Sequence, residues 1–159
     1  MELAKRHPRT DAEVAFESAI DLAPDMLVAR AALANLLQID GRVPEAIAQY
    51  KEMRKRQPNN PAILNDLAWL MASSDDPQIR NPTEAINLAS KACELTNHRM
   101  ASVLDTLATA FASADRFDDA VETMQKALAL STAKNAKPSV SELREKLRRY
   151  ESAGRAIRE

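Results

Sequence analysis

The side chains best suited to catalysis or metal binding are few in this chain and lie far apart. His7 and His98 stand alone in terminal or turn regions, which does not fit a zinc site with its clustered ligands. The adjacent carboxylates of Asp75 and Asp76 lack the further oxygen ligands of a calcium loop. Cys93 follows an alanine on a helical face and is interpreted as a small packing residue. Because no nucleophile–base pair or phosphate-binding glycine loop accompanies them, we expect no enzyme activity, no metal and no cofactor.

The composition predicts an all-helical protein without a charge preference for polyanions. Only 2 of the 159 residues are glycine, and Ala, Leu, Arg and Glu are the most frequent. The formal net charge of −1 gives no reason to expect nucleic acid or an anionic membrane as a partner. No apolar run approaches the ~20 residues of a membrane span, and the first residues lack a signal-peptide core. We therefore expect a soluble, cytoplasmic protein.

The elements that must position any binding residues repeat every 34 residues. Four slots recur in register, and each holds one residue type or size class. Their members are the pairs Leu33-Ala34, Leu67-Ala68 and Leu107-Ala108, the alanines Ala12, Ala46, Ala85 and Ala120, the large residues Phe16, Tyr50 and Met124, and the prolines Pro24 and Pro58. A fixed period of this length is typical of a solenoid in which helix pairs bury their apolar faces against neighbouring pairs.

Apolar residues at helical spacing predict eight helices, and capping residues mark their ends. Thr10 with Glu13, and Ser139 with Glu142, form capping boxes. Gly41 and Gly154 are predicted to end the second and the last helix. The predicted helices span about 11–22, 26–39, 43–56, 61–72, 82–95, 100–114, 117–130 and 140–153.

These slots resemble the tetratricopeptide repeat family, whose unit is a 34-residue helix–turn–helix. The resemblance covers about residues 11–134 and implies an all-α, right-handed α-solenoid of antiparallel helix pairs. It implies about three full repeats, a half repeat and a C-terminal capping helix. The corresponding segments are 1–10 (a flexible or partial N-terminal segment), 11–134 (the array, with half repeat 11–26 and repeats 27–60, 61–99 and 100–134) and 135–159 (the capping helix and tail).

The family resemblance also implies where a partner would bind. The first helix of each pair lines a concave groove in this family, and we expect an extended peptide or a partner helix there. Amides would bond a peptide backbone, Trp69 would anchor it, and the acidic residues would favour a basic or neutral partner. The competing interpretation is that Trp69 packs between helices. The residues predicted to bind peptide are Asn35, Gln38, Asn65, Asp66, Trp69, Asp105 and Thr109.

The chain departs from the repeat at two places. Leu67 and Ala85 are 18 residues apart where the other units have 13, so five residues are inserted near 73–80, interpreted as a solvated loop. At the front, the helix 11–22 matches the second helix of a repeat and lacks a first, which suggests a fragment or a truncated repeat. We expect that helix to bury Val14, Ala15, Ala19 and Leu22, and its uncovered face to permit a homodimer.

The last helix and its flanks are basic, with eight Lys or Arg against four Glu over residues 134–159. Such a segment could contact RNA or an acidic partner, or form a solvated cap, and the cap is favoured. Val140, Leu143, Leu147 and Tyr150 form one apolar stripe, and Glu142 and Glu145 stand at spacings that pair with Lys146 and Arg149.

The sequence therefore predicts a protein–protein interaction scaffold of unknown partner. A second hypothesis is an accessory or regulatory repeat region of a larger enzyme or membrane-associated protein. The matching surface has no clamp of lysine and arginine for acidic chaperone tails, so the expected partner is not acidic.

Overall fold

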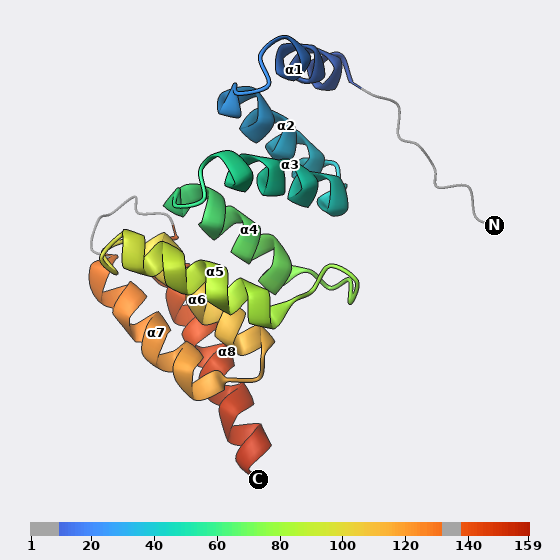
Figure 1. The fold of residues 1–159 in the computed structure, drawn as a ribbon. Coiled ribbons are helices and arrows are strands. Elements are labelled where there is room, and N and C mark those ends of the chain that lie inside the picture. The colour runs from blue at the N-terminus through green and yellow to red at the C-terminus, as the bar shows by residue number, and fades with distance from the viewer. Residues whose placement is uncertain (1–9, 132–137) are drawn as a thin grey trace, which may run out of the picture. The chain divides into compact units, whose positions relative to one another are not determined.

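In a computed structural model of the chain, residues 10–131 and 138–159 are described, and these ranges form eight α-helices and no strand (Figure 1). All helices but the last agree with their predicted ranges to within one residue. The segment 1–9, predicted as flexible or partial, and the loop 132–137 lie outside the described residues. The helices are α1 (Asp11–Leu22), α2 (Leu27–Ile39), α3 (Val43–Arg56), α4 (Pro61–Ser73), α5 (Pro82–Leu95), α6 (Ala101–Ser113), α7 (Phe117–Leu130) and α8 (Val140–Arg158).

Side chains cap the starts of α1, α4, α5 and α8. The Asn60 side chain accepts from the Ala62 amide at 3.0 Å, and the Asn81 side chain accepts from the Glu84 amide at 3.1 Å. Ser139 and Glu142 form a complete capping box at α8. At α1 the Thr10 hydroxyl accepts from the Glu13 amide at 3.2 Å, which is only half of the predicted capping box, because the Glu13 carboxylate pairs with Arg42. These bonds satisfy amides that have no partner inside their own helix.

The described chain divides into two compact units, up to Arg56 and from Gln57 onward. In the first unit α1 packs against α2, and α2 against α3, around Leu33, Ala34, Ala46 and Tyr50. The prediction that α1 buries Val14, Ala15 and Leu22 is wrong, because Val14 is 49% and Leu22 is 88% exposed and Ala15 is exposed as well. With one packed neighbour, α1 buries only the opposite face, which carries Ile20 and Glu13.

Glu13 is a buried carboxylate that ties α1 to the start of α3. Its Oε1 accepts from Arg42 Nη1 at 2.8 Å, and its side chain is 2% exposed. Arg42 also donates to Glu45 one turn into α3. Apolar periodicity did not indicate this pair, since a glutamate in the first turn of a helix is ordinarily a capping residue on the surface.

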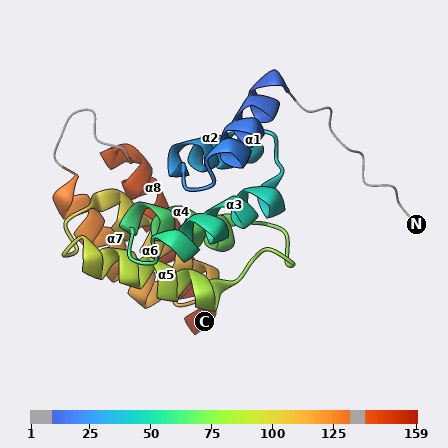
Figure 2. The ribbon, with the colours of Figure 1, turned by 45° about the horizontal axis from the view of Figure 1, so that its top comes forward.

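The second unit holds helices α4 to α8. In Figures 1 and 2, α4, α6 and α8 follow one another on one side of this unit, and α5 and α7 lie on the other. The repeat slots form its core: Leu67, Ala68, Ala85 and Ala120 are completely buried, which lets the helices approach closely. Cys93 is completely buried as predicted for a packing residue, and burial raises the pKa of its thiol to about 11.

Two glycines have different roles from one another. Gly41 has φ +73°, a left-handed conformation that ends α2 as predicted. Gly154 was predicted to end the last helix, and this is wrong, because α8 continues to Arg158. Gly154 is buried against α7, where an added Cβ would lie 3.1 Å from the Phe117 Cβ. Its missing side chain permits a close helix contact.

The turn between α5 and α6 contains two consecutive left-handed residues, Asn97 and His98, with φ of 51° and 54°. The end of the inserted loop after α4 is tied back to α4 and across to α6. The Asn81 amide donates to the Met71 carbonyl at 3.1 Å, and Arg80 Nη2 donates to the Ser113 carbonyl at 3.0 Å. None of the helices in the described ranges has both the length and the apolar character needed to cross a bilayer.

Candidate peptide-binding site

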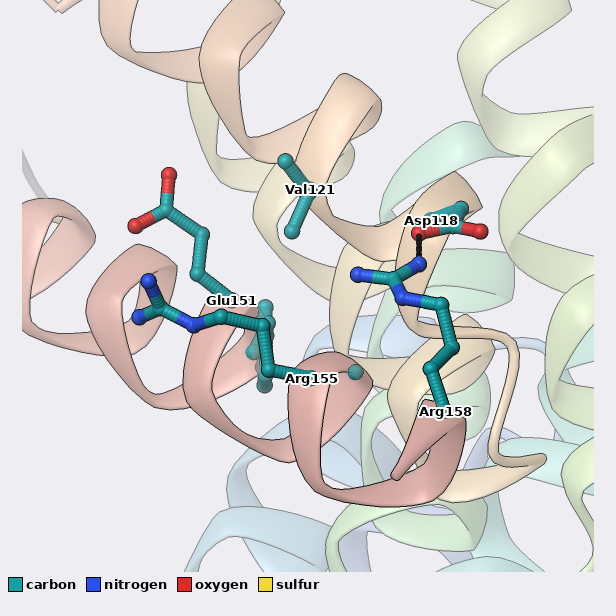
Figure 3. A pocket seen from close by; sticks show the side chains of 7 residues that line it. Asp118, Val121, Glu151, Arg155 and Arg158 are labelled. Carbon is teal, nitrogen blue, oxygen red and sulfur yellow. Dashed lines mark hydrogen bonds and ion pairs between the residues drawn. The ribbon is translucent and has the colours of Figure 1, made fainter.

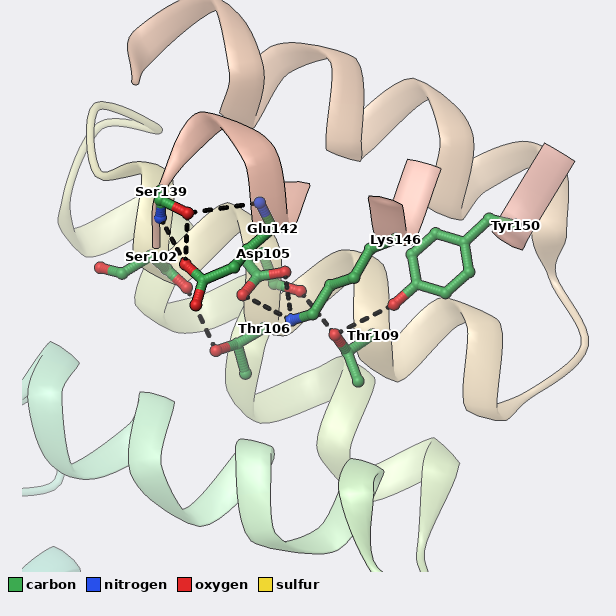
Figure 4. Close-up of polar contacts among 8 residues, drawn as sticks. All are labelled: Ser102, Asp105, Thr106, Thr109, Ser139, Glu142, Lys146 and Tyr150. Atoms are coloured by element: carbon green, nitrogen blue, oxygen red, sulfur yellow. Dashed lines mark hydrogen bonds and ion pairs between the residues drawn. The ribbon is translucent and has the colours of Figure 1, made fainter. Parts of the chain in front are cut away.

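The candidate site lies in the second unit, where α4, α6 and α8 present polar side chains to one another. On α4 position 69 follows position 66 by three residues and position 65 by four, so Trp69 shares a face with each of them. On α6 the positions 105 and 109 share a face for the same reason, and on α8 so do 146 and 150. The capped starts of α4 and α8 fix the rotation of these faces. Figure 4 shows the contacts between α6 and α8.

The strongest contact joins Lys146 of α8 to Asp105 of α6. The Lys146 Nζ lies 2.7 Å from Asp105 Oδ1 and 2.8 Å from Oδ2 (Figure 4). The side chain of Asp105 is 10% exposed and that of Lys146 is 25% exposed. Burial raises the pKa of the Asp105 carboxyl above its usual value, although the Lys146 ammonium opposes that shift.

Trp69 of α4 supplies a third group around the same ammonium. The Lys146 Nζ lies 4.7 Å from the centroid of the Trp69 ring, within the range of a cation–π contact. Trp69 is half-buried. Three helices thus meet at one positive charge, and two of them contribute residues that the sequence predicted as peptide ligands.

A second contact between α8 and α6 lies one turn further along. The hydroxyls of Tyr150 and Thr109 are 3.2 Å apart, and Thr109 Oγ1 donates to the Asp105 carbonyl at 2.9 Å (Figure 4). Burial raises the pKa of the Tyr150 phenol. The predicted ligands Asp105 and Thr109 are therefore both engaged by the chain's own last helix.

The amides predicted on α4 have a different environment. Asn65 Nδ2 donates to Asp66 Oδ1 at 3.3 Å, so these two neighbours are coupled. Asn65 Oδ1 is buried and has no hydrogen-bond partner among the described residues. An unpaired buried acceptor costs about 1–3 kcal/mol, so a donor from a ligand would be stabilising there.

Asn35 and Gln38 lie in the first unit and contact Tyr50 of α3. Gln38 Nε2 donates to the Tyr50 hydroxyl at 3.1 Å, and that hydroxyl donates to Asn35 Oδ1 at 3.3 Å. These bonds tie α2 to α3. A groove shared by these two amides and the five predicted residues of the second unit remains a prediction.

The sequence interpretation missed Lys146 and Tyr150 as members of the site. Spacing within α8 pairs Lys146 with Glu142, and the apolar stripe includes Tyr150. A signal was present, since Lys146 follows Leu143 by three residues and precedes Tyr150 by four. Helical periodicity therefore places Lys146 on the packed side of α8.

A separate hollow of about 320 Å³ lies between α7 and the end of α8 (Figure 3). It is lined by Asp118 and Glu151 as well as by Arg155 and Arg158, and Arg158 Nη1 donates to Asp118 Oδ1 at 2.7 Å. Two acidic and two basic residues balance its charge, so it does not favour ions of either sign.

No protein-family model matches the chain, and no curated protein matches its sequence. Solved structures do match. TTC0263, a thermophilic TPR protein from Thermus thermophilus, has 21% identity and a TM-score of 0.66, over 89% of this chain and 75% of that one. A structure of MamA protein has 17% identity and a TM-score of 0.62, over 89% and 78%. A second MamA structure has 15% identity and a TM-score of 0.61, over 91% and 88%.

These likenesses show the fold. The chain has the all-α helical-repeat fold of these solved TPR and MamA structures, and the fold class predicted from the sequence is confirmed.

Proposed function

We propose that the protein is a non-enzymatic interaction scaffold and that the surface of α4 and α6 binds a basic or neutral peptide or helix of another protein. The observation that carries this proposal is the ammonium of Lys146 held between Trp69 and Asp105. Trp69 and Asp105 belong to the repeats, whereas the ammonium that they contact belongs to Lys146 of α8, a helix packed against the repeats. The same groups have the chemistry to receive a cationic side chain from a partner.

Two neighbouring features support this assignment. The unpaired Asn65 Oδ1 is an acceptor for a peptide N–H, one turn of α4 before Trp69. Asp66 adds a negative charge beside it, which disfavours an acidic partner. A half-buried tryptophan next to polar groups is a frequent anchor in interfaces, because it offers a large contact area with little loss of side-chain freedom.

The test is capture of partners by the immobilised protein, followed by titration of each captured protein in purified form. The double variant Trp69→Ala/Asn65→Ala should lose the captured partner and keep its helical circular dichroism. Gln125→Ala removes an exposed amide on α7 and is the matched control, which should bind like the wild type. Capture that is unchanged in the double variant would exclude this surface.

Peptides of known composition test whether the partner's binding segment carries positive or negative charge. A labelled amphipathic helix with one lysine per turn is compared with the same helix carrying glutamate at those positions. The lysine peptide should bind more tightly at about 0.15 M salt, where screening still leaves short-range pairs effective. Equal binding of both peptides, or preference for glutamate, would contradict the proposed basic partner.

We also propose that α1 forms a contact between two copies of the chain. The alanines Ala46, Ala85 and Ala120 are completely buried, whereas Ala12 in the same slot is exposed. Leu22 on the outer face of α1 is 88% exposed.

Sedimentation of the wild type at about 100 μM should show a dimer, because this concentration lies in the range of weak interfaces. Leu22→Glu should abolish it, and Ile157→Glu on α8 should not. A monomeric wild type at that concentration overturns the idea.

A further inference from the structure

Two residues outside α8 contact the Lys146 ammonium, the carboxylate of Asp105 and the ring of Trp69. Trp69 comes from α4 and Asp105 from α6, and each is fixed by its own repeat. Asp105 carries its charge at 10% side-chain exposure, which makes it expensive to leave unpaired. A fixed aromatic face and a fixed carboxylate that converge on one nitrogen are the parts of a binding subsite.

We propose that Trp69 and Asp105 form a subsite for a primary alkylammonium group, the end group of a lysine side chain, and that Lys146 fills it until a partner's lysine takes its place. The subsite itself is independent of the proposed function, and only the partner's lysine rests on that function. The ligand class is thereby narrowed from a basic or neutral peptide to one that presents a lysine.

The geometry favours lysine over arginine. One nitrogen lies 2.7 and 2.8 Å from both carboxylate oxygens and 4.7 Å from the centre of the Trp69 ring. A compact ammonium places its whole charge at that point. A guanidinium spreads its donors over a planar fork and would have to bond the carboxylate edge-on while stacking on the indole.

Exchange of lysines requires the movement of one side chain and leaves α8 in place. Leu143 is completely buried, Gly154 packs closely on Phe117, and Tyr150 bonds Thr109, so the helix is held on both sides of Lys146. The Lys146 side chain is 25% exposed and therefore has a path to water. Asp105 is paired with an ammonium before and after the exchange, which avoids a buried unpaired charge.

The experiment removes the Lys146 side chain by substitution and adds a small ammonium compound that matches the atoms removed. Lys146→Ala removes Cγ, Cδ, Cε and Nζ, which together correspond to n-propylammonium. Propylammonium chloride should raise the unfolding midpoint of this variant by a few degrees at about 100 mM, as expected for a small ligand with a Kd of about 1–10 mM. It should also change the fluorescence of Trp69, the only tryptophan, in a saturable way.

Five controls define the result, two of them solutes and three of them protein variants or the wild type. Sodium chloride and n-propanol at the same concentration should have no such effect, which separates ammonium binding from ionic strength and from apolar contact. The wild type should not respond, because its subsite is filled. Lys146→Ala/Asp105→Asn should not respond, because the carboxylate is gone. Lys126→Ala, which removes an exposed lysine on α7, should be unaffected by propylammonium.

If Lys146→Ala is unfolded without ligand, the readout becomes recovery of helical circular dichroism in propylammonium chloride and its absence in sodium chloride. Failure of propylammonium to stabilise or refold the variant, or an equal response from the Asp105→Asn double variant, overturns the subsite. The test is separate from partner capture. Rescue by propylammonium with no loss of capture in Trp69→Ala/Asn65→Ala would contradict the proposed function and the partner's lysine, and the alkylammonium subsite would stand.

Discussion

The ammonium of Lys146 and the carboxylate of Asp105 form an ion pair in which the two partners differ in their access to water. Lys146 Nζ lies 2.7 and 2.8 Å from the two Asp105 oxygens, while the side chains are 25% and 10% exposed. A long lysine stem can redirect its charge into solvent, whereas the aspartate cannot. The two single substitutions should therefore have unequal effects on stability.

Lys146→Met should destabilise the protein more than Asp105→Asn does. Methionine preserves most of the stem and leaves Asp105 buried without its cation, at a cost of about 3 kcal/mol. Asp105→Asn leaves an ammonium that can turn to water, at a cost of about 1 kcal/mol. Urea unfolding of both variants and of the double variant measures this. Equal losses, or a larger loss for Asp105→Asn, would contradict the unequal access to water.

Asp105 should also give the pair an unusual pH dependence. Burial raises the folded-state pKa of its carboxyl above the usual 3.8, in spite of Lys146. The folded protein then holds this proton more tightly than the unfolded chain does, so the contribution of Asp105 to stability is greatest below about pH 3.8 and is lost as pH rises through the folded pKa.

The measurement is the free energy of unfolding of wild type and Asp105→Asn at a series of pH values from below the ordinary pKa of 3.8 up to neutrality. The wild type should lose stability relative to the variant as pH rises through this range, since asparagine does not titrate. A relative gain with rising pH would mean that the attraction of Lys146 outweighs the cost of burying the carboxylate.

Periodicity was sufficient for the fold because each repeat slot has one structural role. Ala46, Ala85 and Ala120 share a slot and are all completely buried at helix contacts. Ala12 occupies the same slot and is exposed, as are Val14 and Leu22 on the same helix. Helical spacing identifies an apolar face, and burial also requires a neighbouring helix to cover that face.

The site was only partly predictable for a related reason. The repeat positions on α4 and α6 predicted three of the site residues, Trp69, Asp105 and Thr109. Lys146 and Tyr150, which contact them, belong to a helix outside the repeat. Contacts between side chains 41 residues apart depend on how α8 packs and on the reach of a lysine, and neither is a property of spacing. The misassigned Gly154 has the same origin, since a cap and a close contact both favour glycine.

Gly154→Ala should lower the stability of the protein by about 1 kcal/mol in spite of the higher helix propensity of alanine. The new Cβ would lie 3.1 Å from the Phe117 Cβ, which is fixed to the backbone of α7 and cannot easily move. Ser152→Ala, on the exposed side of the same helix, is the control and should be neutral or slightly stabilising. A stabilised Gly154→Ala would show that α7 and α8 separate freely.

The pair between Glu13 and Arg42 should contribute more to stability than the neighbouring pair between Arg42 and Glu45. Glu13 is 2% exposed and Glu45 is 55% exposed, although both accept from the same guanidinium. Glu13→Ala leaves a cavity and removes the buried partner of Arg42, which should cost about 3 kcal/mol. Glu45→Ala removes an exposed pair worth at most about 0.5 kcal/mol. Chemical unfolding of both variants compares them, and similar losses would show that water reaches the Glu13 carboxylate between α1 and α3.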